Sequence, residues 1–270
     1  MKLGIGTYAY MWSIGFPGAA PERPMTALDL LAKARELGVR VVQIGPNLPL
    51  DQLSEAEREA IVRQAREGQL ELEIGTRGLE TDHLRRYVAL TARVGATLLR
   101  TIPEVAGGKV PSVPEIAAYL RAIIPDLAAA GVRLAMENGR IPAQDLDGLL
   151  RTLACPWIGI TLDTVNSLAI PEGTEEVVQT LARHTLCLHL KEFVVQRVWH
   201  MMGFTVEGRP AGKGQLNVPW LLDTLRAAGV SPNAILELWP PEQKTLQETI
   251  ALEQAWAVES INYLRQYIPD

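Results

Sequence analysis

Four residues of types that commonly bind metal ions lie at the ends of predicted strands in the second half of the chain. They are Glu137, Asp163, His189 and Glu237. The first two steps between them are both 26 residues, the length of one strand–helix unit, and the third is 48 residues. Buried carboxylates are costly unless an opposite charge compensates them. Three carboxylates and one imidazole form a mostly hard ligand set, which predicts one divalent metal ion, Mn²⁺ in first place, with Mg²⁺, Co²⁺ or Zn²⁺ as alternatives.

Eight short apolar runs supply the strands that must position these residues. Several are apolar almost throughout, as is typical of parallel strands buried on both faces. The predicted strands are 3–7, 39–45, 70–76, 97–102, 133–138, 158–163, 185–191 and 234–239. Helical periodicity lies between them, over 26–37, 82–94, 113–130, 144–153, 174–183, 218–228 and 245–267. Strands that alternate with helices in this way imply a parallel sheet.

Eight such units in 270 residues predict an α/β fold, a single (β/α)8 TIM barrel. An open doubly wound sheet is the rival, but no GxGxxG turn follows the first strand. The strand-to-helix joins 14–24, 103–114 and 193–219 are long and rich in Gly and Pro. Because such loops build the active site of a β/α barrel, we expect the site at that end. No linker divides the chain, so we predict one TIM-barrel domain over 1–270.

Composition and charge narrow the class of protein. The formal net charge is −5 and no basic run stands out, which argues against a nucleic-acid surface. The two cysteines do not form a disulfide framework. The N-terminal segment lacks the pattern of a signal peptide, and no apolar stretch is as long as a membrane helix. We therefore expect a cytoplasmic protein with a small-molecule ligand and neither nucleic-acid nor membrane partners; a homodimer is possible.

The second half of the chain resembles the xylose isomerase-like TIM barrel superfamily, in particular its sugar phosphate isomerase/epimerase branch. The matching segments are AMEN at 135–138, ITLDTVNS at 160–167, LHLKEF at 188–193, GKGQLNVPWLL at 212–222 and ILELW at 235–239. The resemblance implies an isomerase or epimerase of a sugar, sugar acid or related polyol. It also implies that Glu137 and Glu237 are catalytic as well as metal-binding, because one would remove a proton beside a metal-bound carbonyl and the other would return it.

One position departs from the ketose epimerase pattern. Three residues after the metal-binding Asp, those epimerases carry a His that touches substrate, whereas this chain has Asn166. An amide can hydrogen-bond a hydroxyl group but is neither acid nor base near neutral pH. A metal-dependent dehydratase of inosose or dehydroshikimate type remains an alternative, since its reaction also starts by deprotonation beside a metal-bound carbonyl. A non-catalytic metal or sugar binder is a further alternative. A DNA-repair endonuclease of the same superfamily is disfavoured by the acidic charge.

Further residues are predicted to line the substrate pocket. Lys191 follows His189 by two positions, so both should face the same side of their strand, where Lys191 would contact either substrate or a neighbouring acid. Gln43 and Arg100 are polar residues within apolar strands and therefore need partners. The predicted substrate-binding residues are Asn166, Lys191, Arg197, His200, Trp239, Trp12, Gln43 and Arg100. For the loop residues among them the alternative is exposure to solvent, and for the tryptophans it is core packing.

Overall fold

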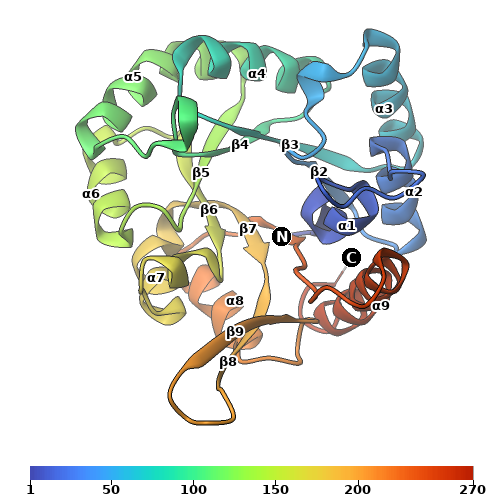
Figure 1. The fold of residues 1–270 in the computed structure, drawn as a ribbon. Coiled ribbons are helices and arrows are strands. Elements are labelled where there is room, and N and C mark those ends of the chain that lie inside the picture. The colour runs from blue at the N-terminus through green and yellow to red at the C-terminus, as the bar shows by residue number, and fades with distance from the viewer. Residues whose placement is uncertain (270) are drawn as a thin grey trace.

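The structure is a computed structural model that describes residues 1–269. Eight parallel strands close into a barrel in the order β1–β10–β7–β6–β5–β4–β3–β2 (Figure 1). The barrel strands are β1 (Leu3–Gly6), β2 (Val41–Ile44), β3 (Glu71–Arg77), β4 (Leu98–Ile102), β5 (Arg133–Glu137), β6 (Ile158–Asp163), β7 (Thr185–Leu190) and β10 (Asn233–Leu236). The single (β/α)8 TIM barrel predicted from the sequence is confirmed.

Helices form a ring around the barrel (Figure 1). They are α1 (Met11–Ile14), α2 (Ala27–Glu36), α3 (Glu55–Glu67), α4 (Thr81–Arg93), α5 (Val113–Ala130), α6 (Ala143–Leu153), α7 (Thr174–Leu181), α8 (Val218–Ala227) and α9 (Leu246–Leu264). Short 3-10 helices in the connections are η1 (Thr7–Tyr10), η2 (Leu50–Gln52), η3 (Ala106–Gly108), η4 (Asn166–Ala169) and η5 (Ala182–His184). In the described part of the chain, no helix is long and apolar enough to cross a membrane.

Helix α3 is not among the helices expected from apolar periodicity. It buries only Ile61 and Ala65, so its apolar stripe is too sparse to produce a clear helical pattern. Its start is defined instead by a capping box, in which Ser54 Oγ accepts a hydrogen bond from the backbone N–H of Glu57 and the Glu57 carboxylate accepts one from the backbone N–H of Ser54. The local hydrogen bonds at the first turn are therefore the better signal for this helix.

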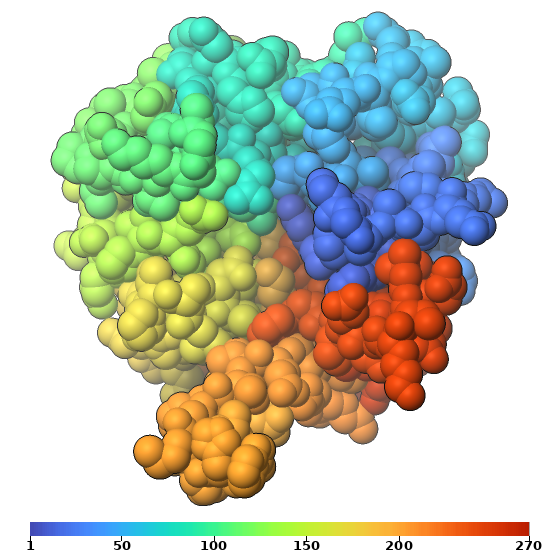
Figure 2. All heavy atoms as spheres, viewed as in Figure 1, coloured from blue at the N-terminus to red at the C-terminus, as the bar shows by residue number. Residues whose placement is uncertain are grey.

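The segment between β7 and α8, expected as one long loop, contains an antiparallel hairpin. Strand β8 (Glu192–Arg197) pairs with β9 (Phe204–Arg209) in a separate two-stranded sheet. The hairpin projects beyond the ring of helices (Figures 1 and 2). It carries most of the exposed large apolar side chains of the described residues, namely Trp199, Met201, Met202, Phe204 and Val206. This hairpin is a correction to the sequence analysis.

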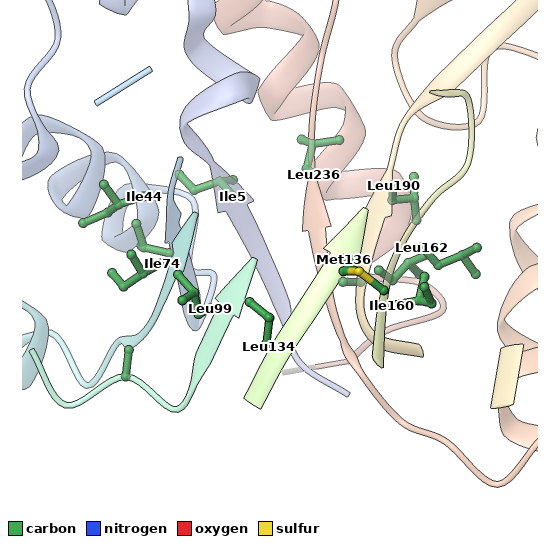
Figure 3. Close-up of a cluster of buried hydrophobic side chains, with 14 of the residues drawn as sticks. Ile5, Ile44, Ile74, Leu99, Leu134, Met136, Ile160, Leu162, Leu190 and Leu236 are labelled. Atoms are coloured by element: carbon green, nitrogen blue, oxygen red, sulfur yellow. The ribbon is translucent and has the colours of Figure 1, made fainter. Parts of the chain in front are cut away.

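The barrel wall separates two apolar layers, because alternate residues of a strand face opposite sides. Outward-facing side chains such as those of Leu134, Met136 and Leu162 belong to the large core between the barrel and the helices (Figure 3). A second, small cluster consists of Val41, Leu98, Ala135, Cys187 and Ile235. These residues alternate with outward-facing neighbours, so this second cluster lies inside the barrel. It forms the floor on which the polar residues of the site rest.

Candidate functional site

Each residue of the inner apolar cluster is followed, two positions later, by a polar residue. Since side chains two positions apart on a strand face the same side, these polar residues form the next inward layer toward the strand ends. They are Gln43, Arg100, Glu137, His189 and Glu237. Asp163 ends β6 and is in register with His189 on β7. The barrel therefore gathers residues from four strands, Glu237 from the position directly after β10 and Asp163 from β6 into one ring.

The four predicted metal ligands meet around one atom of this ring, Nδ1 of His189. Glu137 Oε2 lies 3.7 Å from it and Asp163 Oδ2 lies 4.0 Å from it. Glu237 Oε1 lies 3.2 Å from the same atom. One potential ligand atom from each of Glu137, Asp163 and His189 lies within 4.8 Å of the other two. Donor atoms that share one metal ion at about 2.0–2.2 Å lie roughly 3–4 Å apart, so the spacing suits one ion.

The same four side chains each hold a buried polar atom that meets no hydrogen-bond geometry within the described residues, although two of these atoms, on Glu137 and Asp163, form ion pairs with Arg100 and Lys191. The atoms are Glu137 Oε2, Asp163 Oδ2, His189 Nδ1 and Glu237 Oε1. Buried polar atoms without such a partner are uncommon in folded proteins. They are also the four atoms that face one another across the ring. A divalent cation among them would be a shared partner for all four, so the donor set fits a metal ion.

Two cations already lie against these acids. Lys191 Nζ lies 2.8 Å from Asp163 Oδ2 and 2.9 Å from Glu237 Oε2, and Arg100 forms an ion pair with Glu137. Burial lowers the pKa of Lys191, but the neighbouring carboxylates outweigh this effect and raise it above its usual value. Lys191 is therefore an ammonium group. It contacts neighbouring acids, which is one of the two alternatives that the sequence left open.

Electrostatics keep Glu237 ionised. Burial alone would raise the pKa of this carboxyl group. The neighbouring His189, together with the positive charges of Lys191 and Arg100, opposes burial and holds the pKa at about 2. At neutral pH Glu237 is consequently a carboxylate that binds cations.

The four predicted metal ligands, Glu137, Asp163, His189 and Glu237, are called the cluster below. Asn166 connects two sides of this cluster. Its Nδ2 donates a hydrogen bond to Glu137 Oε1, and its Oδ1 accepts one from Lys191 Nζ at 3.3 Å. Gly139 packs directly against this amide residue, because a Cβ on Gly139 would lie 2.5 Å from Asn166 Cβ. The φ angle of Gly139 is 107°, a region that favours glycine. The turn after β5 therefore holds Asn166 in place.

The second ring nitrogen of His189 points into the barrel. Its Nε2 lies 2.7 Å from Gln43 Oε1, and Gln43 Nε2 donates to Glu73 Oε2 at 3.0 Å. Gln43 thus contacts a predicted metal ligand, but it does not line the cavity beside the cluster. Glu73 was missed by the sequence analysis. It is a polar residue within an apolar strand, which is the signal that singled out Gln43 and Arg100.

Two predicted pocket residues, Trp239 and Trp12, make packing and hydrogen-bond contacts with neighbouring segments of the chain. Trp239 Nε1 donates to the backbone oxygen of Glu192 at 3.0 Å, which ties the end of β10 to the start of the hairpin. Trp12 is half-buried in α1, where its ring packs edge-on against Phe16 at 5.1 Å and its backbone N–H donates to Glu253. Both tryptophans therefore have packing partners in their own neighbourhoods.

The remaining two predicted substrate residues lie on the hairpin. Arg197 donates to the backbone oxygen of Met201 at 2.9 Å and stacks over the ring of Phe204 at 4.9 Å. His200 is exposed at the turn of the hairpin, with its ring 5.2 Å from that of Trp199. The contacts of both residues stay within the hairpin. The structure therefore does not bring Arg197 and His200 to the cluster.

A cavity of about 260 Å³ opens beside the cluster. Its lining residues are Ile102, Glu137, Asn138, Gly139, Arg140, Asn166 and Ala169. Arg140, at 38% side-chain exposure, is only loosely paired, because its guanidinium lies 3.4 Å from Glu104 Oε2. Glu104 is engaged more closely by Arg77 at 2.7 Å. The cavity thus presents one carboxylate of the cluster, two asparagines and one accessible guanidinium to a small polar ligand.

Comparison with known proteins agrees with this architecture. Residues 13–267 match the family described as xylose isomerase-like TIM barrel. The 3-oxo-isoapionate decarboxylase of Pectobacterium atrosepticum is 33% identical over 265 residues, which cover 98% of this chain and 95% of that protein. The resemblance inferred from the strand-end motifs is therefore confirmed.

Solved structures show the same fold at lower identity. A D-psicose 3-epimerase with D-fructose has a TM-score of 0.73 and 16% identity, and each chain is covered completely. A xylose isomerase-like TIM barrel protein from Mycobacterium smegmatis in complex with magnesium has a TM-score of 0.71 and 14% identity, with 97% of each chain covered. At these identities the similarity concerns the fold alone.

Proposed function

The chain belongs to the xylose isomerase-like TIM barrel family, and on that premise we propose that it is a divalent-metal-dependent decarboxylase of a 3-oxo sugar acid. The observation that carries this proposal is the similarity to 3-oxo-isoapionate decarboxylase over nearly the whole of both chains. By its name, that relative removes the carboxyl group of an acid that also carries a ketone. The epimerase structures share only the fold and do not select a reaction.

We assign the metal ion to Glu137, Asp163, His189 and Glu237. Two buried acceptor atoms that make no hydrogen bond, His189 Nδ1 and Glu237 Oε1, face each other at 3.2 Å, which supports this assignment. The oxygen-rich donor set favours Mn²⁺ or Mg²⁺. When bound, the ion supplies Lewis-acid chemistry, because it withdraws electrons from a carbonyl group of a ligand in the site.

In the proposed reaction the bond between the carboxyl carbon and its neighbour breaks. Carbon dioxide leaves, and the bonding electron pair stays on the carbon next to the ketone. A proton must then form the new C–H bond. Lys191 is our candidate donor, because its ammonium group lies inside the cluster, within 2.9 Å of two of the acids. It would afterwards regain a proton from solvent.

The cavity beside the cluster suits a small polyhydroxylated acid. Its volume of about 260 Å³ is slightly below the range of about 300–1,000 Å³ that holds drug-sized ligands. Arg140 offers a guanidinium for the substrate carboxylate. Asn166 offers an amide for a hydroxyl group, although its present partners are Glu137 and Lys191.

Isomerisation or epimerisation, the reaction first expected from the sequence, is our second candidate. It is favoured by the approach of Glu137 and Glu237 to the same histidine nitrogen, at 3.7 and 3.2 Å, from different strands. Each of these acids is however paired with a cation, Arg100 or Lys191. Ion pairing weakens a carboxylate as a base and an ammonium group as an acid, so decarboxylation ranks first on the similarity to 3-oxo-isoapionate decarboxylase. A dehydratase has no separate observation in its favour.

The decisive experiment offers both reactions to one preparation. Protein stripped with EDTA and reloaded with Mn²⁺ is incubated with five- and six-carbon 3-oxo sugar acids, and carbon dioxide is measured. In parallel, a panel of ketoses is incubated in deuterated water and followed by NMR. We expect carbon dioxide from an acid only after reloading. Glu237→Gln should lose both bound manganese and activity, and the exposed control Glu242→Gln should keep both.

Two results would contradict the proposal. Carbon dioxide production that is equal in the stripped and reloaded protein would exclude the metal requirement. Deuterium incorporation into a ketose, together with no carbon dioxide from any acid, would favour the isomerase.

A further inference from the structure

Three buried polar side chains form a chain that leads from the cluster into the barrel. His189 Nε2 lies 2.7 Å from Gln43 Oε1, and Gln43 Nε2 donates to Glu73 Oε2 at 3.0 Å. The three residues are 0%, 3% and 2% exposed, respectively. They stand on β7, β2 and β3. Because they are sealed from solvent, their donors and acceptors must match within the protein.

The direction of these hydrogen bonds follows from the acid at the far end. An ionised carboxylate only accepts, so Glu73 requires the N–H side of the Gln43 amide. That orientation turns Oε1 of Gln43 toward His189. An amide oxygen also only accepts, so the facing Nε2 of His189 must carry a proton. A neutral imidazole has one ring proton, which leaves the lone pair on Nδ1.

Other donors hold Glu73 in its accepting role. Asn233 Nδ2 donates to Oε1 of Glu73 at 3.0 Å, and Cys187 Sγ lies 3.4 Å from Oε2. Burial raises the pKa of Glu73, and the hydrogen bonds from Asn233, Gln43 and Cys187 act against that rise. The carboxylate form can accept from all three, whereas a protonated form would turn one oxygen into a donor that faces donors.

We infer that Glu73, acting through Gln43, is a positioning residue that places the His189 proton on Nε2 and keeps Nδ1 available to a metal ion. The inference rests on the proposed metal site. Neither residue belongs to the proposed ligand set or lines the cavity beside the cluster. Their effect is on the ligand atom that faces Glu137 and Glu237. Such outer hydrogen bonds typically change metal affinity about tenfold to hundredfold.

Mn²⁺ affinity, measured by calorimetry on the full chain, tests the inference without reference to activity. Glu73→Gln places an amide where the carboxylate was, and that amide can present either its oxygen or its N–H to Gln43. We expect its affinity to fall about tenfold to hundredfold. The matched control is Glu71→Gln, because Glu71 also accepts from Asn233 but makes no contact with Gln43. Its affinity should stay within about twofold of wild type.

Exchanging the two side chains separates positioning from packing. In the double variant Gln43→Glu with Glu73→Gln, the carboxylate introduced at position 43 can accept from His189 Nε2 and from the amide at position 73. Volume and total charge are conserved. We therefore expect the double variant to recover most of the affinity lost by Glu73→Gln. Nitrogen-15 spectra of the Mg²⁺-saturated wild type should show the His189 proton on Nε2.

The inference is overturned by a proton on Nδ1 in those spectra, by equal affinities of Glu73→Gln and Glu71→Gln, or by a double variant as weak as Glu73→Gln alone. Thermal unfolding of each variant verifies that it is folded. If the wild type binds no Mn²⁺, both the proposed metal site and this inference are wrong. If the wild type binds Mn²⁺ but Glu73→Gln and Glu71→Gln have equal affinities, only this inference is wrong.

Discussion

Arg100 and Glu137 form an ion pair in which each side chain is only 3% exposed. They stand on the neighbouring strands β4 and β5 and face the barrel interior. Removal of one partner of a buried pair leaves an uncompensated charge, which costs about 3–5 kcal/mol. The pair therefore compensates the negative charge of the cluster whenever no metal ion does so.

This relationship makes the stability of an Arg100 variant depend on metal. Arg100→Met should lower the free energy of unfolding of metal-free protein by about 3–5 kcal/mol. The loss should be smaller in saturating Mn²⁺, because the ion compensates Glu137. Urea unfolding with EDTA and with Mn²⁺ measures both values, and Arg85→Met, an exposed arginine at 50% side-chain exposure, is the control. An equal loss in both conditions would contradict the role assigned to Glu137.

Replacement of Lys191 should separate catalysis from metal binding. In Lys191→Met the cluster keeps its four ligands and loses an ammonium that competes with the ion for Asp163 and Glu237. We expect metal content to be maintained and kcat for carbon dioxide release to fall about 10²-fold or more. The control Lys213→Met removes an exposed lysine, at 63% side-chain exposure, and should leave kcat unchanged. Unaltered kcat in Lys191→Met would exclude Lys191 as the proton donor.

Glu253 on α9 should make stability depend on pH. This residue is 0% exposed and accepts hydrogen bonds from the backbone N–H groups of Trp12 and Ser13. Burial raises its pKa to about 7, since the hydrogen bonds only partly oppose it. The folded protein thus binds the proton more tightly than the unfolded chain, whose glutamate pKa is about 4.3. The free energy of unfolding should consequently fall as pH rises between these two values.

Comparison with a glutamine variant isolates this effect. Between pH 5 and pH 8, the wild type should lose about 2–3 kcal/mol more free energy of unfolding than Glu253→Gln does. Urea unfolding in EDTA at the two pH values measures the difference. The control Glu259→Gln lies on the same helix with 46% side-chain exposure and should behave as the wild type. Parallel pH profiles of the wild type and Glu253→Gln would exclude a raised pKa.

The hairpin residues offer a test of the sequence-based substrate assignment. Within residues 1–269, the contacts of Arg197 and His200 are with other hairpin residues. We therefore expect Arg197→Ala and His200→Ala to leave kcat and KM within about twofold, and stability within about 0.5 kcal/mol. Steady-state kinetics and thermal unfolding provide the values. A rise in KM of tenfold or more, with kcat maintained, would mean that the hairpin reaches the substrate during turnover.

The barrel was predictable because its strands carry strong local signals. Each strand is an apolar run with clear ends, and the parallel arrangement brings those ends into one ring. The positions of Glu137, Asp163 and His189 at three consecutive strand ends were therefore enough to predict that they meet. Their roles as metal ligands remain predictions, as do the one-domain organisation, the cytoplasmic location and the homodimer.

The contacts inside the ring could not be read from the sequence. Strand tilt and register decide which inward-facing residues of different strands touch, and neither leaves a local pattern. That is why the pairing of Gln43 with Glu73 and His189, across three strands, was missed. The hairpin was missed for a related reason, because most of its large apolar side chains are exposed and therefore do not mark a face that packs on a core.

The closure of the barrel has a consequence for its synthesis. Strand β1 pairs with β10, so Leu3 has Ala234 as its partner. A ribosome releases the first of these residues long before the second is translated. Until then β1 has one unpaired edge, which is a template for unwanted pairing. Glu237 lies directly after this last strand, so a nascent chain can complete neither the wall nor the acidic cluster before residue 237 has emerged.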